Sequence, residues 1–488
     1  MRKPFVLTRM TSALTRPTAG SLGRYWWWTA LGTLATLTMV TTGAHIAALP
    51  VPDTDFWWRG YGGLTYLESH ALFYAAFAAL TLAWWSLRPG DAPTPLRRIA
   101  TTWSLWATPL FLGAPLASRD IYSYVAVGRL AGLGANPYVT SAYHGLTGDT
   151  LSSVAFIWRG TITPYGPLFI ALCHAATALA GSSEGAAVLV VRGSELLGVA
   201  LLALGLRLLT ATSPRRTEWA WWLALLGPAP LLAYASSGHN DVLMLGLLVS
   251  GCAFVQRRRW YLGAALLGLA VAVKLTAALG VVAVLLLLRS VGRTPWRRLV
   301  AVIGIVVATV VLIAVAVGDG FGWMSWRALH VPVLIHTEIT PVTNVAHFLR
   351  QILAWCGLPL AFSHLLRYVN DAALLVEVAG LLWLARGVNG DNWRTRLGLA
   401  LLLVVFLGPT VWPWYFLWGI TVLASTAAVR RPVFAAISVV TALLVGPGGT
   451  MMIGGNGFLV TAPVLVALTW FAARRGVMNS LVAWRDED

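Results

Sequence analysis

Apolar stretches long enough to cross a bilayer recur along almost the whole chain. Set against about 20 residues for one span, they predict about fourteen transmembrane helices, within about twelve to sixteen because several runs are short. The predicted spans are 26–48, 66–87, 99–116, 186–211, 218–236, 240–256, 258–274, 275–290, 299–317, 368–388, 397–411, 414–429, 432–449 and 457–473. This pattern predicts an all-α polytopic membrane protein that forms a single transmembrane domain over residues 1–488.

Composition and charge agree with this fold class and argue against a nucleic-acid partner. Of the 488 residues, 58% are apolar and 11% are charged, and the mean hydropathy is +0.73. The net charge of +17 comes from short basic clusters between apolar runs rather than from one continuous face. With a cytoplasmic N-terminus, most of the 35 Lys and Arg residues fall in cytoplasmic loops. We therefore expect a multi-pass protein of the plasma (inner) membrane, with both termini cytoplasmic and a first helix that is retained.

The sequence predicts no cofactor and no metal site. Cys173, Cys252 and Cys356 lie in apolar or amphipathic segments without paired spacing, which is typical of packing residues rather than of disulfides or zinc ligands. A glycine-rich phosphate loop between a strand and a helix is also missing, so a soluble nucleotide is not the expected substrate. The chemistry is expected from groups at the membrane surface.

Two long loops, 117–185 and 318–367, are expected on the extracytoplasmic side. Loops of this length usually carry function. Within the first loop, helical spacing over 118–130 predicts an amphipathic helix on the outer leaflet. The stretch 164–180 is predicted to enter or follow the outer interface and return, since a full span would put Arg215 and Arg216 outside.

Asp120 is the first candidate for chemistry, because it starts the amphipathic helix directly after a predicted span. A carboxylate at this boundary can act as a base on lipid-borne substrates, and it can equally cap the helix. Asp53 and Asp55 in the first outer loop are the competing acids, although a solvated loop position is their default interpretation.

Two further polar sites lie at predicted outer helix junctions. In the sequence GHND, His239, Asn240 and Asp241 could orient a sugar or a phosphate, or Asn240 and Asp241 could cap the next helix. Lys274 is one of only two lysines in an arginine-rich chain, so a compact point charge is indicated there. It could meet a phosphate, or it could be a snorkelling or paired residue.

Other candidates carry weaker signals. Arg192 and Glu195 are spaced for a local ion pair on one helix. The aromatic turn 412–415 could stack on a sugar, although the headgroup belt is the safer interpretation. His336 and Glu338 could bind an acceptor or simply be solvated.

The order of motifs resembles a known family. In chain order the motifs are SRDIYSYVAVGRL at 118–130, GLGANPY at 132–138, TPYGPLF at 163–169, GHND at 238–241, Lys274 and VWPWY at 411–415. Over roughly residues 100 to 420 this order resembles the integral-membrane glycosyltransferases of the GT-C class, most closely the actinobacterial α-(1→6)-mannopyranosyltransferases.

The resemblance implies a GT-C fold and an inverting transfer of mannose from polyprenyl-phosphate mannose to a lipid-anchored α-(1→6)-mannan, in lipomannan and lipoarabinomannan synthesis. The resemblance also implies that the protein contacts membrane lipids. The loop aspartate of the family falls on Asp120, as general base for the acceptor 6-hydroxyl. The remaining roles follow more from topology than from motif. They place the donor phosphate at Lys274, His239 and Arg119, and the sugars at Tyr122, Tyr165, Asn240, Asp241, Trp412 and Trp414.

Two departures keep alternatives open. Ile121 follows Asp120 where several relatives carry a second acid, so a metal-binding acidic pair is not supported. More than one predicted span precedes this loop, where many relatives have one, and a catalytic first loop would make Asp53 or Asp55 the base. The rival functions are another polyprenyl-phosphate sugar transferase, for arabinose or glucose, and a lipid or sugar flippase. A flippase predicts charges at the midplane and paired broken helices.

Overall fold

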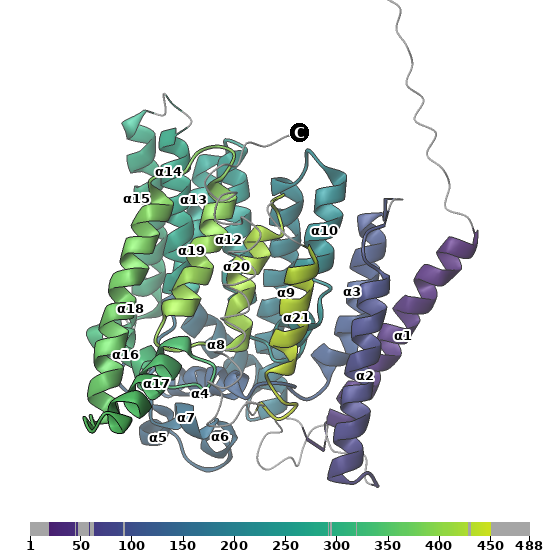
Figure 1. Cartoon of the computed structure of the whole chain (residues 1–488), viewed down its shortest axis with the longest axis horizontal. Helices are drawn as coiled ribbons and strands as arrows, with labels where there is room; N and C mark the ends of the chain where they lie inside the picture. The colour runs from purple at the N-terminus through teal and green to yellow at the C-terminus, as the bar shows by residue number, and fades with distance from the viewer. Residues whose placement is uncertain are drawn as a thin grey trace, which may run out of the picture.

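Long helices run side by side between two ends of the molecule in the computed structural model, as Figure 1 shows. The structure describes residues 19–43, 45–46, 58, 63–90, 93–290, 292, 295–318, 320–427 and 431–449. In this part of the chain every regular element is a helix, which agrees with the predicted all-α class.

The spans predicted at 186–211, 240–256 and 258–274 each match one helix closely. The helices are α1 (Ala19–Gly43), α2 (Tyr66–Ser86), α3 (Leu96–Leu112), α4 (Asp120–Gly132), α5 (Ala142–Gly145), α6 (Gly148–Ser153), α7 (Phe156–Arg159), α8 (Pro167–Ala180), α9 (Glu184–Leu209), α10 (Pro214–Ala224), α11 (Pro228–Pro230), η1 (Leu231–Ser236), α12 (Asp241–Gln256), α13 (Trp260–Val273), η2 (Leu275–Ala277), α14 (Ala278–Ser290), α15 (Trp296–Val317), η3 (Gly322–Met324), α16 (Trp326–Leu334), α17 (Pro341–Trp355), α18 (Phe362–Ala385), α19 (Trp393–Leu407), η4 (Pro413–Tyr415), α20 (Phe416–Leu423) and α21 (Arg431–Leu443).

Three of the described helices are long and apolar enough to cross a membrane by themselves, namely α9, α15 and α18. A fourth span forms if the pair Pro228–Ser236 and Asp241–Gln256, bent by 110°, counts as one. The protein is therefore a polytopic membrane protein, while the predicted number of about fourteen spans stays a prediction. The span predicted at 457–473 lies outside the described residues.

One predicted span is wrong as a continuous helix. Residues 218–236 divide into the end of α10, a break at residues 225–227, the short α11 and the π-helix η1. Pro228 and Pro230 lack the backbone N–H that a continuing helix needs. A separate bend of 110° follows η1, so the GHND motif lies buried at a sharp turn between η1 and α12 rather than at a simple helix end.

Close backbone packing places two of the motifs. A Cβ atom at Gly246 would lie 2.2 Å from the carbonyl oxygen of Gly198, so only glycine lets α9 and α12 approach this closely. A Cβ atom at Gly166 would likewise lie 2.2 Å from the carbonyl oxygen of Ala272, and the Gly166 amide donates to the Val273 carbonyl at 2.9 Å. The PYGP turn is thereby fixed against the end of α13, next to Lys274.

Both predicted long loops are helical. Residues 117–185 contain α4 to α8, and residues 318–367 contain η3, α16, α17 and the start of α18. The amphipathic helix predicted at 118–130 corresponds to α4, which packs against α8 and α9 and is largely buried. The second predicted interfacial helix is α8, whose bounds lie within 164–180. Its place relative to a membrane stays a prediction.

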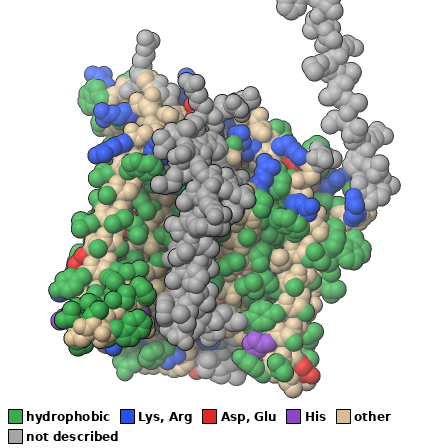
Figure 2. All heavy atoms as spheres, viewed as in Figure 1, with side chains coloured by type: hydrophobic (Ala, Val, Ile, Leu, Met, Phe, Trp, Pro, Cys, Tyr) green, Lys and Arg blue, Asp and Glu red, His purple; other side chains and the backbone are tan. Residues whose placement is uncertain are grey.

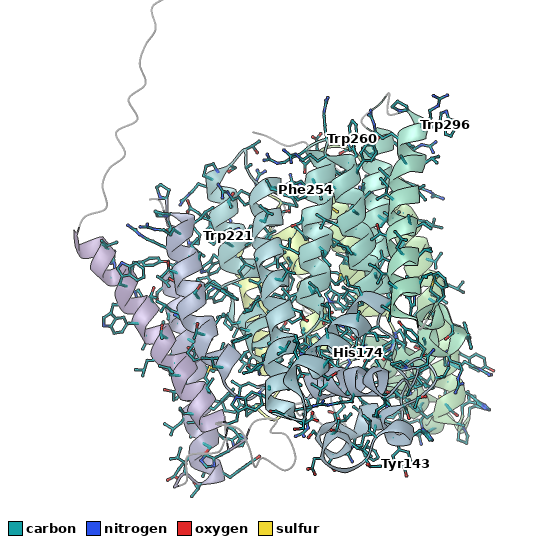
Figure 3. All side chains as sticks on the ribbon, turned by 180° about the vertical axis from the view of Figure 1, so that it is seen from behind. Tyr143, His174, Trp221, Phe254, Trp260 and Trp296 are labelled. Carbon is teal, nitrogen blue, oxygen red and sulfur yellow. The ribbon has the colours of Figure 1, made fainter. Side chains whose placement is uncertain are left out.

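Charge differs between the two ends of the molecule. Figure 2 shows most of the visible Lys and Arg side chains along its upper edge, whereas α4 to α7, α16 and α17 lie at the lower end in Figure 1. Figure 3, seen from behind, places Trp260 and Trp296 at the upper end and Tyr143 at the lower end. Both long loops are thus opposite the basic edge.

Candidate active site

Five segments meet where α4 begins. Asp120 comes from the first residue of α4, and the GHND motif comes from the bend between η1 and α12. Tyr165 precedes α8, Lys274 lies between α13 and η2, and the aromatic turn 412–415 leads into α20. Side-chain contacts join these segments into one cluster, although its residues lie far apart in the sequence.

Asp120 is held by an indole rather than by the helix it starts. Its Oδ1 accepts a hydrogen bond from Trp158 Nε1 at 2.7 Å, and its Oδ2 lies 3.7 Å from His239 Nδ1. The helix has no side-chain cap bond, so the capping interpretation of Asp120 is wrong. The residue is only 7% exposed. Burial raises the pKa of Asp120 to about 6 because it disfavours the charged form, while the Trp158 bond acts in the opposite direction.

The buried Asp241 and the mostly buried Lys274 form an ion pair. Lys274 Nζ lies 2.8 Å from Asp241 Oδ1, and Trp418 Nε1 donates to the same oxygen at 2.6 Å. The ammonium also lies 4.4 Å from the ring centroid of Tyr415 and 5.9 Å from that of Tyr165. The paired interpretation of Lys274 is therefore correct, and an ammonium with three donors still has N–H groups for another ligand.

His239 begins a row of aromatic rings that reaches Trp158. Its ring stacks on Trp414 at 3.8 Å between centroids, Trp414 stacks on Trp412 at 5.0 Å, and Trp412 lies 6.0 Å from Trp158. The side chains of Trp412 and Trp414 are buried inside the protein. Their assignment to the headgroup belt is therefore wrong.

The GHND motif keeps unsatisfied polar atoms inside the protein. Both ring nitrogens of His239 and both side-chain polar atoms of Asn240 are buried without a hydrogen-bond partner among the described residues. Asn240 precedes α12 but makes no cap bond, so its capping interpretation is wrong, as it is for Asp241, which binds Lys274. Buried polar groups without partners are costly, and they are typical of sites that bind a ligand.

Arg119 and Tyr122 lie on the other side of Asp120. Arg119 donates from Nε and Nη2 to the Ser153 carbonyl at 3.2 and 2.9 Å, and its guanidinium lies 5.4 Å from the Tyr122 ring centroid. Arg159 donates to the carbonyls of Ser152 and Val154. Arg119 thus ties the end of α6 to the start of α4, and Arg159 ties it to α7.

The expected pair of Arg192 and Glu195 is wrong. Arg192 Nη1 instead donates to the carbonyls of Phe111 and Gly113, each at 2.6 Å. These carbonyls end α3, where the last backbone acceptors have no helical partner and attract a cation. Spacing on one helix made the ion pair possible, but the neighbouring helix end supplied the stronger partner.

The second long loop positions the aromatic turn. Thr337 Oγ1 donates to the Val411 carbonyl at 2.6 Å, and the Val411 amide donates to Thr340 Oγ1 at 3.1 Å. His336 and Glu338 flank Thr337, and their role in binding an acceptor stays a prediction. Asp53 and Asp55 lie outside the described residues. Of the cysteines, Cys173 and Cys252 are buried as packing residues, whereas Cys356 is exposed.

Two contributors escaped the sequence analysis. Trp158 binds Asp120 from 38 residues away, and nothing in its spacing marks it. Trp418 binds Asp241, and its only signal is that it follows Trp414 by one helical turn in an aromatic segment. The described residues contain no group of three or more His, Cys, Asp and Glu side chains that could hold a metal. The expectation of a metal-free reaction stays a prediction.

Two buried carboxylates, an ammonium group and stacked aromatic rings thus form one polar cluster inside a polytopic membrane protein, as an enzyme with a preformed site would require. Two family models match the chain, one described as "Alpha-(1->6)-mannopyranosyltransferase, N-terminal domain" over residues 29–290 and one as "MptB C-terminal domain" over residues 341–475. The chain belongs to the α-(1→6)-mannopyranosyltransferase family. It is accordingly a glycosyltransferase with mannosyltransferase activity.

Named relatives agree with the family. The chain is 30% identical over 404 residues to alpha-(1->6)-mannopyranosyltransferase A of Mycobacterium tuberculosis, covering 80% of this chain and 77% of the relative. It is 31% identical over 422 residues to a probable alpha-(1->6)-mannopyranosyltransferase of Mycolicibacterium smegmatis, covering 76% and 74%. It is 26% identical over 500 residues to alpha-(1->6)-mannopyranosyltransferase B of Corynebacterium glutamicum, covering 93% and 83%.

Proposed function

We propose that the protein transfers mannose, with inversion, from polyprenyl-phosphate mannose to the 6-hydroxyl of a lipid-anchored α-(1→6)-mannan in lipomannan and lipoarabinomannan synthesis. The family membership supports the transferred sugar and the linkage. The observation that carries the mechanism is the buried Asp120 carboxylate, fixed through one oxygen by Trp158 while the other oxygen faces His239.

Asp120 is the general base in this proposal. The acceptor 6-hydroxyl oxygen attacks the anomeric carbon, its proton passes to Asp120, and the bond between the anomeric carbon and the phosphate oxygen breaks. The electron pair of that bond leaves with the polyprenyl phosphate. A base is most useful when its pKa lies near the working pH, and burial raises the pKa of Asp120 toward that range.

The negative charge that develops on the leaving phosphate needs nearby cations and hydrogen-bond donors. Lys274, His239 and Arg119 are proposed for this role. Lys274 keeps donors beyond the one used by Asp241, and the His239 ring nitrogens have no bond among the described residues. Tyr165, Asn240, Trp412 and Trp414 are proposed to orient and stack on sugars, because hydroxyl-rich rings use amide bonds and aromatic faces.

The same proposal fixes an orientation in the membrane. The basic end seen in Figure 2 faces the cytoplasm together with both termini, as the positive-inside rule predicts. Residues 117–185 then form the extracytoplasmic catalytic loop, and residues 318–367 form a second extracytoplasmic loop. The site would meet its lipid-linked donor and its mannan acceptor outside the plasma membrane.

The test is mannose transfer by membranes that carry the Asp120→Asn variant, with polyprenyl-phosphate mannose and a short α-(1→6)-mannoside. Loss of a general base should lower kcat by about 10² to 10⁴-fold. Asp149→Asn is the matched control, because Asp149 is an exposed acid in the same loop. It should transfer mannose at the rate of the unmodified protein.

Two outcomes would contradict this proposal. Transfer retained by Asp120→Asn would move the base to Asp53 or Asp55. If the unmodified protein transfers no mannose, donors of arabinose and glucose come next. A flippase is the other candidate, since the bend at GHND puts polar groups at a helix break as transporters do. It would move the mannose lipid between leaflets without forming a new glycosidic bond.

A further inference from the structure

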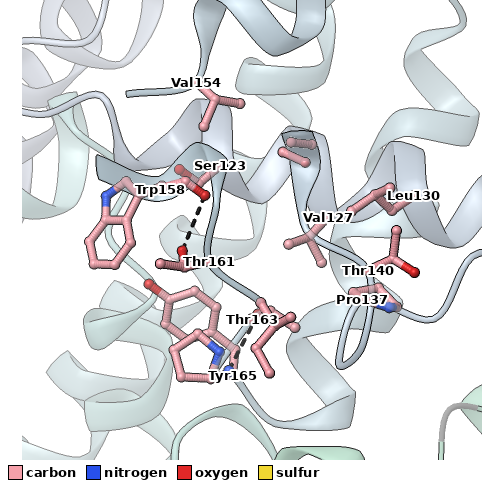
Figure 4. Close-up of a pocket in the computed structure, with 14 residues that line it drawn as sticks. Ser123, Val127, Leu130, Pro137, Thr140, Val154, Trp158, Thr161, Thr163 and Tyr165 are labelled. Carbon is pink, nitrogen blue, oxygen red and sulfur yellow. Dashed lines mark hydrogen bonds between the residues drawn. The ribbon is translucent and has the colours of Figure 1, made fainter. Parts of the chain in front are cut away.

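A pocket lies between α4 and the segment that runs from α7 to the PYGP turn. Figure 4 shows the residues that line it, among them Ser123 and Val127 of α4, and Trp158, Thr161, Thr163 and Tyr165 of the later segment. We call it the hydroxyl pocket, because Ser123, Thr140, Thr161 and Thr163 all line it. It is separate from a second, mostly apolar pocket in which His239 and Trp414 take part.

The hydroxyl pocket is uncharged. All residues that line it are aliphatic, hydroxyl-bearing or aromatic, and the set contains no Asp, Glu, Lys, Arg or His. A phosphate there would lose its hydration without gaining a counter-charge, which is strongly unfavourable. A neutral ligand with several hydroxyl groups fits, because each wall offers both hydrogen-bonding groups and apolar or aromatic surface.

Ser123 provides an independent sign that this ligand carries polar groups. Its hydroxyl oxygen is buried and has no hydrogen-bond partner in the described part of the chain. By contrast, Thr161 Oγ1 donates to the Trp158 carbonyl at 3.1 Å, and Thr163 Oγ1 accepts from the Tyr165 amide at 3.4 Å. A lipid chain would leave Ser123 unsatisfied, whereas a sugar hydroxyl would pair with it.

Trp158 connects the pocket to the base. The same side chain forms part of the wall and donates its indole N–H to Asp120 Oδ1. A sugar ring against this wall therefore lies one side chain away from the carboxylate. On a hexopyranose the 6-hydroxyl stands on an exocyclic carbon, so it extends farther from the ring than the other hydroxyl groups.

We propose that the hydroxyl pocket binds the terminal neutral hexose of the acceptor and turns its 6-hydroxyl toward Asp120, with Ser123 as a specificity-determining residue. This inference rests on the proposed function and names the acceptor site within it. The donor phosphate is excluded from this pocket by the lack of charge, so donor and acceptor reach Asp120 from different sides.

The test uses the full-length protein purified in detergent, with an octyl α-(1→6)-dimannoside as acceptor. Ser123→Ala should raise the acceptor KM by about 3- to 10-fold, the value of one hydrogen bond, while the donor KM changes by less than about twofold. Its melting temperature should stay the same or rise, because the hydroxyl it removes has no protein partner. If Ser123 had only a structural role, Ser123→Ala would lower the melting temperature and leave the acceptor KM unchanged.

Two further variants sharpen the result. Ala126→Leu fills the pocket from α4 and should raise the acceptor KM more strongly than Ser123→Ala. Ser152→Ala is the control, because Ser152 lies on α6 outside the pocket and its hydroxyl bonds only to the Gly148 carbonyl. An unchanged acceptor KM in both pocket variants, or a raised donor KM, would overturn the inference.

Direct binding separates this inference from the proposed function. The dimannoside is titrated into the protein without donor and its binding is followed by tryptophan fluorescence. Weaker binding by Ser123→Ala supports the acceptor pocket even if the unmodified protein transfers no mannose. Equal binding by Ser123→Ala, Ala126→Leu and the unmodified protein overturns the pocket even if transfer is normal.

Discussion

Asp120 and Asp241 are buried carboxylates of one cluster, and the protein holds them in opposite ways. Asp241 receives the Lys274 ammonium and the Trp418 indole on the same oxygen. Asp120 receives one indole, from Trp158, and its second oxygen faces a histidine at 3.7 Å. Asp241 therefore has a cation as a direct partner, whereas the hydrogen-bond donor on Asp120 is a neutral indole and burial raises the pKa of Asp120. Within the proposed mechanism, this difference assigns Asp241 to holding the site together and Asp120 to taking up the proton.

The largest effect is expected when the ion pair of Asp241 and Lys274 is broken. Lys274→Met or Asp241→Asn leaves one buried group without its partner and should lower the free energy of unfolding by about 3–5 kcal/mol. The double variant should lose less than the sum of the single losses, because no uncompensated charge remains. In thermal melts of the purified variants, these losses appear as lower melting temperatures. Asp120→Asn should melt at the temperature of the unmodified protein or above it, and an equal loss at both acids would contradict the comparison.

A smaller effect is expected from the indole that holds Asp120. Trp158→Phe keeps an aromatic wall but removes the N–H that binds the carboxylate. With saturating acceptor, kcat should fall by about tenfold, in line with one hydrogen bond to a charged group. The pKa of Asp120 should rise as well, since that bond lowers it. Trp355→Phe, at an exposed indole on α17, is the control. A loss confined to the acceptor KM would show that Trp158 serves the pocket alone.

The mildest test changes only the pH. Burial raises the pKa of Asp120 to about 6, so the base is charged above that pH and protonated below it. The value of kcat/KM should therefore fall on the acid side of about pH 6, by about tenfold for each further unit. A profile that is flat from pH 7 to 5 would assign the base to another group. The profile of Trp158→Phe should be displaced toward higher pH.

Sequence reasoning found members of the candidate site where a motif marked the end of a predicted span. Asp120, GHND and Lys274 were placed at helix ends, and the structure brings them together because glycines such as Gly166 and Gly246 let the helices approach. The amphipathic pattern after the third predicted span also matched α4. These features depend on local periodicity and on where spans end, which a sequence records.

Side-chain contacts between elements far apart in the sequence could not be predicted in the same way. Arg192 was assigned to Glu195 because spacing on one helix is visible, while the carbonyls that end α3 are acceptors no sequence pattern displays. The Trp412 and Trp414 rings were assigned to the headgroup belt because composition cannot tell an inward aromatic turn from an outward one. Trp158 was missed for the same reason, since its contact exists only after α4 and α7 have packed.

The bond from Trp418 to Asp241 joins the two segments that the family models recognise separately. Asp241 and Lys274 belong to the segment 29–290, and Trp418 belongs to the segment 341–475. Each segment therefore carries only part of the candidate site. Chimaeras that exchange these segments between relatives would stay active only where the C-terminal segment supplies an indole, like that of Trp418, for the acid at position 241.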